Sequence, residues 1–313
     1  MRPLHLVPDG TAIRFMRGRF AGVIVSAVLS TLSVLLFFYP GLNLGVDFRG
    51  GIAVELRGSQ PLQTDVIRQA LAPFDSGDLR VQEFGSPREV LVRFGNQKQV
   101  ENAQRVITAR VAEALPNVEI RRIDVVGATV SSELFRNGLL ATALALAAVL
   151  LYIWFRFEWQ FGVALVATLI LDITKTVGFY AVTGFEFDLN SVAALLTLIG
   201  YSVTDKVVVY DRIRENLAKL RTMPLRGLID LSINQTLGRT VNTSLTVILS
   251  ILPLALIGGE VMRGFSLAII FGIIIGTSSS IFIASPILLF LGEKRLRPAS
   301  ARSSRPSSAA AAQ

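Results

Sequence analysis

Residues 189–210 read LNSVAALLTLIGYSVTDKVVVY, a stretch that is long and apolar enough to cross a lipid bilayer. Asp205 and Lys206 stand side by side within it. A charged side chain at membrane depth costs about 2.5 to 3.5 kcal/mol on insertion scales, so such residues are rare and usually functional. The pair therefore predicts a membrane protein with a functional site inside the bilayer.

Three further charged residues follow the same pattern. Asp172 and Lys175 fall near the middle of the apolar run 161–182, and Arg239 opens the run that ends at Ile257. Ionisable residues inside spanning segments mark proton relays and ion pathways by default. Together with the first pair, these residues indicate a protein that handles protons or ions.

Hydrophobic residues make up 51% of the chain, and they gather in windows close to the length of about 20 residues that a spanning helix needs. We predict a membrane α-helical fold with six transmembrane helices and, because the number is even, both termini on one side. The six windows are Phe20–Tyr39, Leu139–Phe155, Phe161–Val182, Leu189–Tyr210, Thr240–Ile257 and Phe265–Leu291. No small-residue cleavage pattern follows the first window, so we expect a retained anchor rather than a signal peptide.

Basic residues cluster before the first window, between the fourth and fifth, and after the sixth. Short basic segments stay in the cytoplasm, which predicts cytoplasmic termini and a periplasmic domain after the first helix. The net charge of +8 then reflects topology and attraction to membrane lipid, so we expect no nucleic acid partner. The predicted organisation is a cytoplasmic N-terminus (1–19), transmembrane helix 1 (20–40), a periplasmic domain (41–133), a five-helix transmembrane domain (134–291) and a cytoplasmic disordered tail (292–313).

The polar segment 41–133 has the periodicity of strands and helices in alternation. The predicted strands are Ile52–Leu56, Leu79–Phe84, Glu89–Phe94 and Val118–Val126, and the predicted helices are Pro61–Phe74 and Val100–Ala114. This βαββαβ order predicts a ferredoxin-like domain, in which two helices cover an antiparallel sheet.

Fold alone does not give this domain a function. It is either a docking or substrate-handling module or a small lid that stabilises the assembly, and we expect Glu83 and Arg93 to be solvated charges. The segment has no phosphate loop and no nucleophile with a partner base. The chain has no cysteine and one histidine, His5, so we predict neither an enzyme nor a metal or cofactor site.

Helical geometry sorts the charged membrane residues by face. Asp205 ends a small and polar stripe that recurs every four residues, whereas Lys206 points about 100° away, so the two cannot simply neutralise each other. Asp172 and Lys175 are three residues apart and share a face. Arg239 lies on a polar edge of the fifth span, where we expect it to pair with Asp205. In the sixth span, a stripe of small residues that includes Gly272 predicts close helix packing.

Longer motifs contain these residues. Residues 196–216 read LTLIGYSVTDKVVVYDRIREN, residues 45–51 read GVDFRGG, residues 239–244 read RTVNTS, and Gly258-Gly259 and the segment 272–286 follow in order. As a set they resemble the SecD/SecF family of protein-export membrane proteins, within the resistance-nodulation-division superfamily, over nearly the whole chain. We expect structural roles for the motif residues Gly45, Asp47, Gly50, Gly51, Gly200, Tyr201 and Thr243. The glycines at 45, 50 and 51 are expected in turns with positive φ.

The resemblance implies a multi-pass subunit of the Sec machinery in the bacterial inner membrane. Its implied partners are SecD, with which it would form a twelve-helix unit, the SecYEG channel, YajC and the unfolded preprotein. Such a unit uses the proton-motive force to promote export. Matched to the family motifs, Asp205 is the membrane aspartate and Arg239 the membrane arginine, both linked to proton coupling.

Some positions depart from the family pattern. Thr204 and Lys206 flank the aspartate where Asn and Thr are usual, Arg49 stands where Thr is common, and Lys175 in mid-span is unexpected. We therefore predict an altered network of charges, with Asp172 paired to Lys206 and Lys175 paired to Asp205. Whether the coupling ion is a proton or sodium stays open.

In the favoured mechanism, protonation of a membrane carboxylate releases its cation and frees the helices to rearrange. One charge crossing 100 mV is worth about 2.3 kcal/mol, which is comparable with the few kcal/mol between alternative conformers. Three alternatives stand beside it: a static charge network that only fixes helix register, a purely structural subunit of the translocase, and a half-transporter that expels small amphiphiles. The small periplasmic domain argues against the last.

Overall fold

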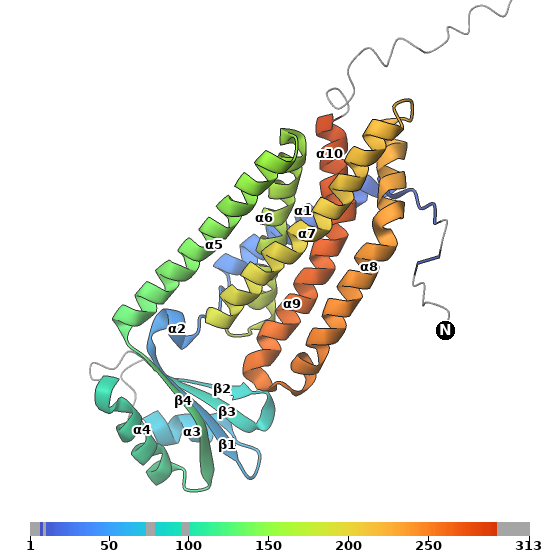
Figure 1. The fold of residues 1–313 in the computed structure, drawn as a ribbon. Helices are drawn as coiled ribbons and strands as arrows, with labels where there is room; N and C mark the ends of the chain where they lie inside the picture. Colours follow the sequence, from blue (N-terminus) through green and yellow to red (C-terminus); the bar gives the residue numbers. More distant parts are fainter. Residues whose placement is uncertain (1–6, 9–10, 73–78, 96–99, 293–313) are drawn as a thin grey trace, which may run out of the picture.

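The computed structural model describes residues 7–8, 11–72, 79–95 and 100–292. Within these ranges a bundle of long helices carries a small domain of strands and helices at one end (Figure 1). The end of the helix predicted over Pro61–Phe74 and the tail predicted beyond Gly292 lie outside the described residues.

Six helices in the described part of the chain are long and apolar enough to cross a membrane, which confirms the predicted membrane α-helical fold. The sixth span is built from three consecutive segments, with a π-helical turn between two α-helices. The segments are α1 (Arg19–Phe38), α5 (Ala128–Arg156), α6 (Trp159–Thr183), α7 (Leu189–Lys219), α8 (Leu225–Ile257), and then α9 (Gly259–Ser279), the π turn (Ser280–Ala284) and α10 (Ser285–Gly292).

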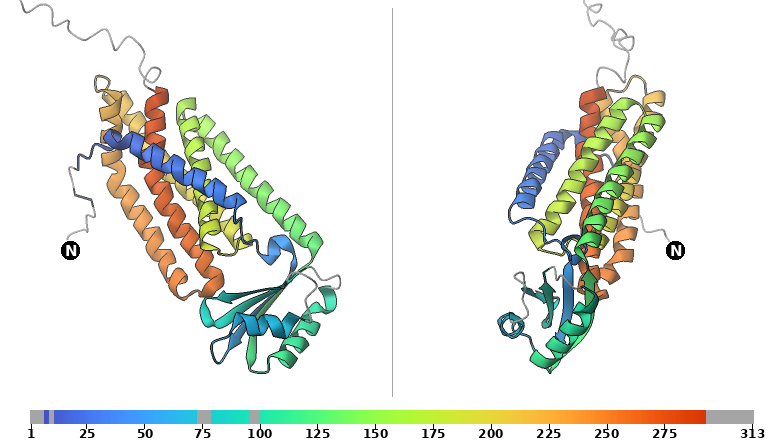
Figure 2. Two further views of the ribbon diagram at one scale, coloured as in Figure 1. Left: turned by 180° about the vertical axis from the view of Figure 1, so that it is seen from behind. Right: turned by 90° about the vertical axis from the view of Figure 1, so that its left-hand side faces the viewer.

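The helices of the bundle are unequally buried. About half of the most apolar window is buried in α6 (50%), α7 (50%) and the α9–α10 span (56%), against 17% in α1 and α8 and 6% in α5. The central helices are therefore α6, α7 and α9. Two of them, α6 and α7, carry the charged side chains that are buried in the described part of the bundle. Figure 2 shows the bundle from two further sides.

Helices α7 and α8 extend well past their predicted windows, and so does α5, which begins at Ala128 rather than Leu139. Helix α7 continues from Tyr210 to Lys219, and α8 begins at Leu225 rather than Thr240. Charged and amide side chains lower the hydropathy of both extensions without breaking the helices. In α8 the extension still buries Leu228 and other apolar residues against the segment before α1.

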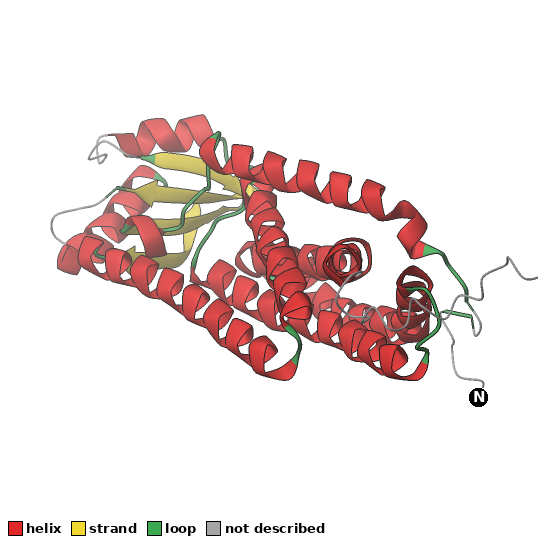
Figure 3. Cartoon of the chain, turned by 90° about the horizontal axis from the view of Figure 1, so that it is seen from above, coloured by secondary structure: helices red, strands yellow, loops and turns green. Residues whose placement is uncertain are grey.

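The small domain contains α2 (Val46–Arg49), β1 (Gly51–Gly58), α3 (Thr64–Leu71), β2 (Arg80–Phe84), β3 (Ser86–Phe94), α4 (Val100–Ala114) and β4 (Val118–Val126). Its four strands lie in the order β2-β3-β1-β4, and every neighbouring pair is antiparallel. Figure 3 shows the strands together at one end of the helical bundle. This arrangement confirms the ferredoxin-like domain that the βαββαβ order predicted.

The two faces of the sheet have different neighbours. Side chains alternate along a strand, so Ile52 and Val54 of β1 pack in the core with α3 and α4. Ala53, between them, points to the other face and packs with Leu91 of β3 and Val46 of α2. Both strand-packed helices lie on one face, which leaves the opposite face turned toward the bundle (Figures 1 and 2).

Candidate functional site

A buried ionic cluster joins two of the central helices, α6 and α7. Lys206 Nζ lies 2.8 Å from Asp172 Oδ2, and Lys175 Nζ lies 3.6 Å from Asp172 Oδ1. All three side chains are buried, with exposed fractions between 0% and 7%. The Asp172 carboxylate therefore lies between two ammonium groups, that of Lys175 on its own helix and that of Lys206 on α7.

Two serine hydroxyls complete the surroundings of this carboxylate. Ser202 Oγ of α7 donates to Asp172 Oδ2 at 2.9 Å, and Ser279 Oγ of α9 donates to the same oxygen at 2.6 Å. Ser202 also accepts from Lys206 Nζ at 2.5 Å. Asp172 is therefore held by donors from three helices, α6, α7 and α9.

Asp205 occupies a different environment. It is 6% exposed, and the hydroxyl side chains of Thr240 from α8 and Ser280 from the π turn lie beside it. Its Oδ2 atom has no hydrogen-bond partner within the described ranges, and no ion pair joins it to a described residue. Asp205 is thus a buried carboxylate with hydroxyl groups beside it and no ion pair to a described residue.

The two predicted ion pairs have opposite outcomes. The pairing of Asp172 with Lys206 is confirmed, but the pairing of Lys175 with Asp205 is wrong, because Lys175 turns to Asp172 on its own helix. Consecutive helical residues diverge by about 100°, so Lys206 and Asp205 face different neighbours, α6 for the lysine and α8 with the π turn for the aspartate.

The expected pairing of Arg239 with Asp205 is also wrong. Arg239 is exposed on the outer face of α8, and the residue that α8 turns toward Asp205 is its neighbour Thr240. Thr243 is exposed as well and donates to the backbone carbonyl of Arg239 at 2.9 Å. The polar edge predicted on the fifth span therefore faces away from the described bundle.

A chain of hydroxyl groups crosses from α7 through α8 to α9. The Tyr201 hydroxyl lies 2.6 Å from Ser244 Oγ, which lies 2.8 Å from Thr277 Oγ1. Gly200, next to Tyr201, is exposed on α7. Tyr201 thus contacts α8 through Ser244, whereas Gly200 lies on the outer surface of α7.

Gly45, Gly50, Gly51 and Asp47 lie where the sheet domain meets the ends of the helices, a region called the joint below. Gly50 (φ 71°) and Gly51 (φ 112°) adopt the positive φ that was predicted, but Gly45 has φ −70°, so that prediction is wrong for Gly45. A Cβ on Gly45 would lie 2.7 Å from Glu186 Oε1, so the Glu186 side chain would have to shift. Asp47 Oδ2 accepts from the backbone N–H of Leu189 at 3.1 Å, at the first turn of α7.

Sequence reasoning missed an ion pair at this joint. Arg93 of β3, expected to be solvated, is only 7% exposed, and its Nη2 lies 2.6 Å from Glu186 Oε2 in the loop between α6 and α7. Its Nη1 donates to Asn43 Oδ1 at 2.9 Å. Glu83 is exposed, as expected. The sequence held one sign of this ion pair, an arginine within the alternating strand 86–94. The alternation places Arg93 on the face of the sheet opposite the core that packs against the helices.

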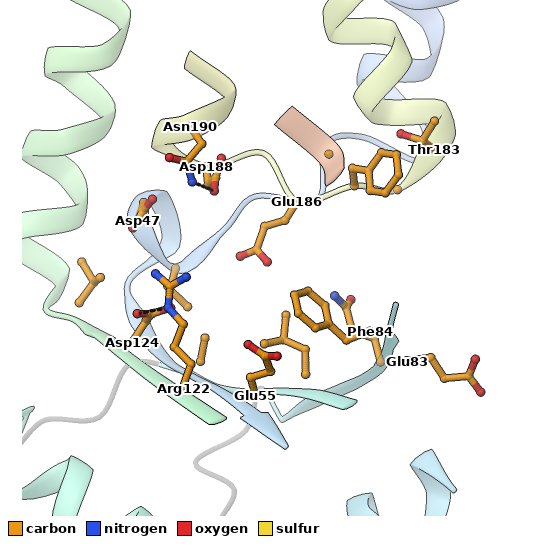
Figure 4. A pocket seen from close by; sticks show the side chains of 18 of the residues that line it. Asp47, Glu55, Glu83, Phe84, Arg122, Asp124, Thr183, Glu186, Asp188 and Asn190 are labelled. Carbon is orange, nitrogen blue, oxygen red and sulfur yellow. Dashed lines mark hydrogen bonds and ion pairs between the residues drawn. The ribbon is translucent and has the colours of Figure 1, made fainter. Parts of the chain in front are cut away.

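The joint encloses a cleft of about 410 Å³ between the open face of the sheet and the ends of the helices (Figure 4). Its lining is rich in carboxylates, and most of them already have partners. Asp124 pairs with Arg122, and Asp188 accepts from the backbone N–H of Ser191 as the N-cap of α7. Burial raises the pKa of Glu186 above its ordinary value, although Arg93 acts in the opposite direction. No cluster of three potential metal ligands occurs in the described parts of the chain.

Two family descriptions match this chain. The C-terminal region of the protein export membrane proteins SecD and SecF matches residues 106–294, which include the buried cluster. The SecD/SecF GG motif matches residues 35–62, which include Gly50 and Gly51.

Individual relatives match nearly the whole chain. The protein translocase subunit SecF of Cereibacter sphaeroides is 41% identical, and the match covers 94% of both chains. The protein translocase subunit SecDF of Brucella abortus is 42% identical over 94% of this chain and 39% of its own length. The crystal structure of SecDF from Thermus thermophilus, a translocon-associated membrane protein, has a TM-score of 0.85 at 36% identity and covers 93% of this chain, which spans 40% of that longer one.

These similarities agree with the fold. The SecF relative covers 94% of this chain, spanning helices and sheet domain alike, and the six apolar helices make this a multi-pass membrane protein. The resemblance seen in the sequence motifs is thereby confirmed. This chain belongs to the SecD/SecF family of protein export membrane proteins.

Proposed function

We propose that this chain is a subunit of the Sec translocation machinery that, together with SecD, uses the proton-motive force to promote export of unfolded preproteins across the bacterial cytoplasmic membrane. Its 41% identity to a SecF translocase subunit supports the machinery. In the SecDF proteins the corresponding region is part of one longer chain, which supports SecD as the partner. SecYEG and YajC enter the proposal through the same family.

The proposed orientation has both termini in the cytoplasm and the sheet domain in the periplasm. The turn between α7 and α8 is at the end of the bundle away from the sheet domain (Figure 1). Basic residues surround that turn, among them Arg214, Lys219 and Arg226. Basic segments near span ends remain cytoplasmic, which supports a sheet domain on the far side, where an exported chain emerges.

The observation that carries the proposal is the contrast between the two buried carboxylates. Asp172 is fixed by two lysines and two serines, whereas Asp205 has hydroxyl groups beside it and no ion pair with a described residue. With Lys175 and Lys206 protonated and both aspartates ionised, the four charges cancel. Asp205 is the member whose charge can change without breaking an ion pair, and we assign it the coupling role.

Neutralising Asp205 by a proton, or by a bound cation, leaves the cluster with one uncompensated positive charge. A net charge in a low-dielectric interior raises the free energy of that helix arrangement. Movement of one charge through 100 mV supplies about 2.3 kcal/mol, enough to bias two arrangements that differ by a few kcal/mol. The cluster would thus convert ion entry into movement of α6 against α7.

Helix α7 provides the proposed route to the periplasmic side. Asp205 and Lys206 lie in its middle, and its N-terminus is bound to the joint by the Asp188 cap and by Asp47. Arg93 attaches the sheet to the loop directly before α7. A shift of α7 would therefore reach the sheet domain through these contacts.

The outer face of α8 is proposed to receive SecD. Arg239 is exposed there at membrane depth, where contact with lipid alone is unfavourable. A partner helix that brings a carboxylate or a polar face would satisfy it. In this proposal Arg239 keeps its coupling role, but it acts at the boundary with SecD rather than as the partner of Asp205 within this chain.

The test is export of a periplasmic reporter in cells depleted of their own SecF and supplied with this chain and its SecD. We expect Asp205→Asn to accumulate normally but to fail in export. The matched control is Asp211→Asn, the same change six residues further along α7, where the carboxylate is half-exposed and pairs with Arg156. Normal export by Asp205→Asn at wild-type membrane levels contradicts the coupling role and favours a purely structural subunit. Failure to copurify with SecD favours the small-amphiphile transporter instead.

A further inference from the structure

Three consecutive serines lie where α9 passes into the π turn, and each has a different environment. Ser278 is exposed and donates to the carbonyl of Ile275 at 2.9 Å. Ser279 and Ser280 are fully buried, at 0% exposure. A run of three identical residues thus divides into one that faces outward and two that face the charged interior.

The two buried serines face different carboxylates. Ser279 Oγ donates to Asp172 Oδ2 at 2.6 Å. The Ser280 hydroxyl donates to the carbonyl of Thr277 at 2.8 Å, and its side chain lies beside Asp205. Asp172 is on α6 and Asp205 on α7, so these neighbouring serines connect the two helices that carry the cluster.

The π turn supplies the local geometry. Residues of a regular α-helix repeat every 3.6 positions, and a π turn widens the helix locally and changes the direction of the side chains that follow. The backbone of this widened turn is partly satisfied by a side chain, because Ser285 Oγ donates to the carbonyl of Ser280 at 2.9 Å. Single π turns of this kind are frequent at functional sites.

The outer side of the π turn is held by α1. A Cβ on Gly22 would lie 2.7 Å from Phe282 Cβ and 2.9 Å from the Phe282 carbonyl oxygen, so the glycine allows direct backbone contact. The Phe282 ring also meets Phe15 edge-on, at 5.9 Å between centroids. The π turn therefore packs between the first helix and the charged cluster.

We propose that Ser279 and Ser280 are positioning residues of the ion-coupling site, with Ser279 holding the Asp172 side chain in place by its hydrogen bond and Ser280 packing beside Asp205. The assignment rests on the proposed coupling function of the cluster and adds two residues to it. Ser279 has one hydroxyl proton and two acceptors in reach, Asp172 Oδ2 and the carbonyl of Gly276 at 2.9 Å.

The test is chemical modification by a hydrophobic carbodiimide, which reacts with protonated carboxyl groups inside membranes. The full chain is produced with SecD in native membranes, treated, and analysed by mass spectrometry for modification at each aspartate. Modification at Asp172 is counted as the adduct or as the amide formed with a neighbouring lysine. The variants are Ser279→Ala and Ser280→Ala, with Ser278→Ala as the matched control.

We expect Ser279→Ala to increase modification of Asp172 roughly tenfold, the effect of one lost hydrogen bond to a charged group. Ser280→Ala should change modification at Asp205 and leave Asp172 as in the wild type, and Ser278→Ala should change neither. If Ser279→Ala does not accumulate, the near-isosteric Ser279→Cys, a weaker donor, should show a smaller increase at Asp172.

Unchanged modification at Asp172 in a Ser279 variant present at wild-type levels would overturn the assignment, and so would equal changes in all three serine variants. The readout is independent of export. If Asp205→Asn exports normally while the serine variants alter modification as expected, the positioning roles stand and the coupling function fails.

Discussion

Arg93 in the sheet domain and Glu186 in the loop before α7 form an ion pair of 2.6 Å across the boundary between the domain and the bundle. The guanidinium is 8% exposed and the carboxylate 25% exposed, so water screens the pair only partly. Asn43 accepts from the same guanidinium and donates to the carbonyl of Gly184 at 3.0 Å. Arg93 thereby links β3 both to the loop before α7, through Glu186, and to the segment after α1, through Asn43.

Replacing Arg93 by Met should detach the sheet from this loop. Removing one partner of a largely buried ion pair leaves the other charge uncompensated, and we expect the free energy of unfolding to fall by about 3 kcal/mol. Arg122→Met is the control, because its pair with Asp124 is about half-exposed and should be worth less than about 1 kcal/mol. Thermal unfolding of the purified protein measures both, and equal losses would contradict a special role for Arg93. The exchange Arg93→Glu with Glu186→Arg should recover part of the loss.

Glu186 should make stability depend on pH. Burial raises its pKa above the ordinary value of 4.5, so the folded protein binds this proton more tightly than the unfolded chain. Stability contributed by this group is then lost as the pH rises above about 4.5. We expect Glu186→Gln, measured by thermal unfolding, to gain stability relative to the wild type as the pH is raised. Burial also raises the pKa of Glu55, but Glu55 is present in both proteins, so its effect cancels when they are compared. A difference that stays constant with pH would contradict the assignment.

The double glycine should tolerate substitution poorly at its second position. At Gly51, φ is 112° and an added Cβ would collide with the carbonyl oxygen of Phe94 in the neighbouring strand. Gly184 is the matched control, since its φ of 71° is also positive but nothing lies within 4 Å of an added Cβ. We expect Gly51→Ala to abolish accumulation in membranes and Gly184→Ala to cost about 1 kcal/mol. Similar protein levels for the two variants would show that the collision is relieved.

Asp172 and Asp205 should respond differently to the same substitution. Asp172→Asn leaves Lys175 and Lys206 without their shared counter-ion, a loss of about 3 to 5 kcal/mol for a buried pair. We expect low membrane levels for Asp172→Asn and partial recovery when Lys206→Met is added. Immunoblots of membranes that contain either variant or Asp205→Asn make the comparison. Normal accumulation of Asp172→Asn would argue that the network does not stabilise the bundle.

The sequence by itself determined the spanning helices, the order of elements in the sheet domain and the membership of the family. These follow from local properties: the length of apolar runs, the alternation along Gly51–Gly58 and neighbouring strands, and motifs of fixed spacing. Helical periodicity also showed that Lys206 and Asp205 face apart. It placed Asp172 and Lys175 together for the same reason.

Only the tertiary structure decided which partner each charged residue has. Helical geometry gives the direction of a side chain but not the neighbouring helix in that direction, so Arg239 was expected inside and lies outside, and Lys175 was expected to pair with Asp205 and pairs with Asp172. Arg93 looked like a surface residue because the loop that covers it lies far away in the sequence. Pairing between distant segments depends on how helices and strands pack, and that packing places one carboxylate among cations and the other among hydroxyl groups.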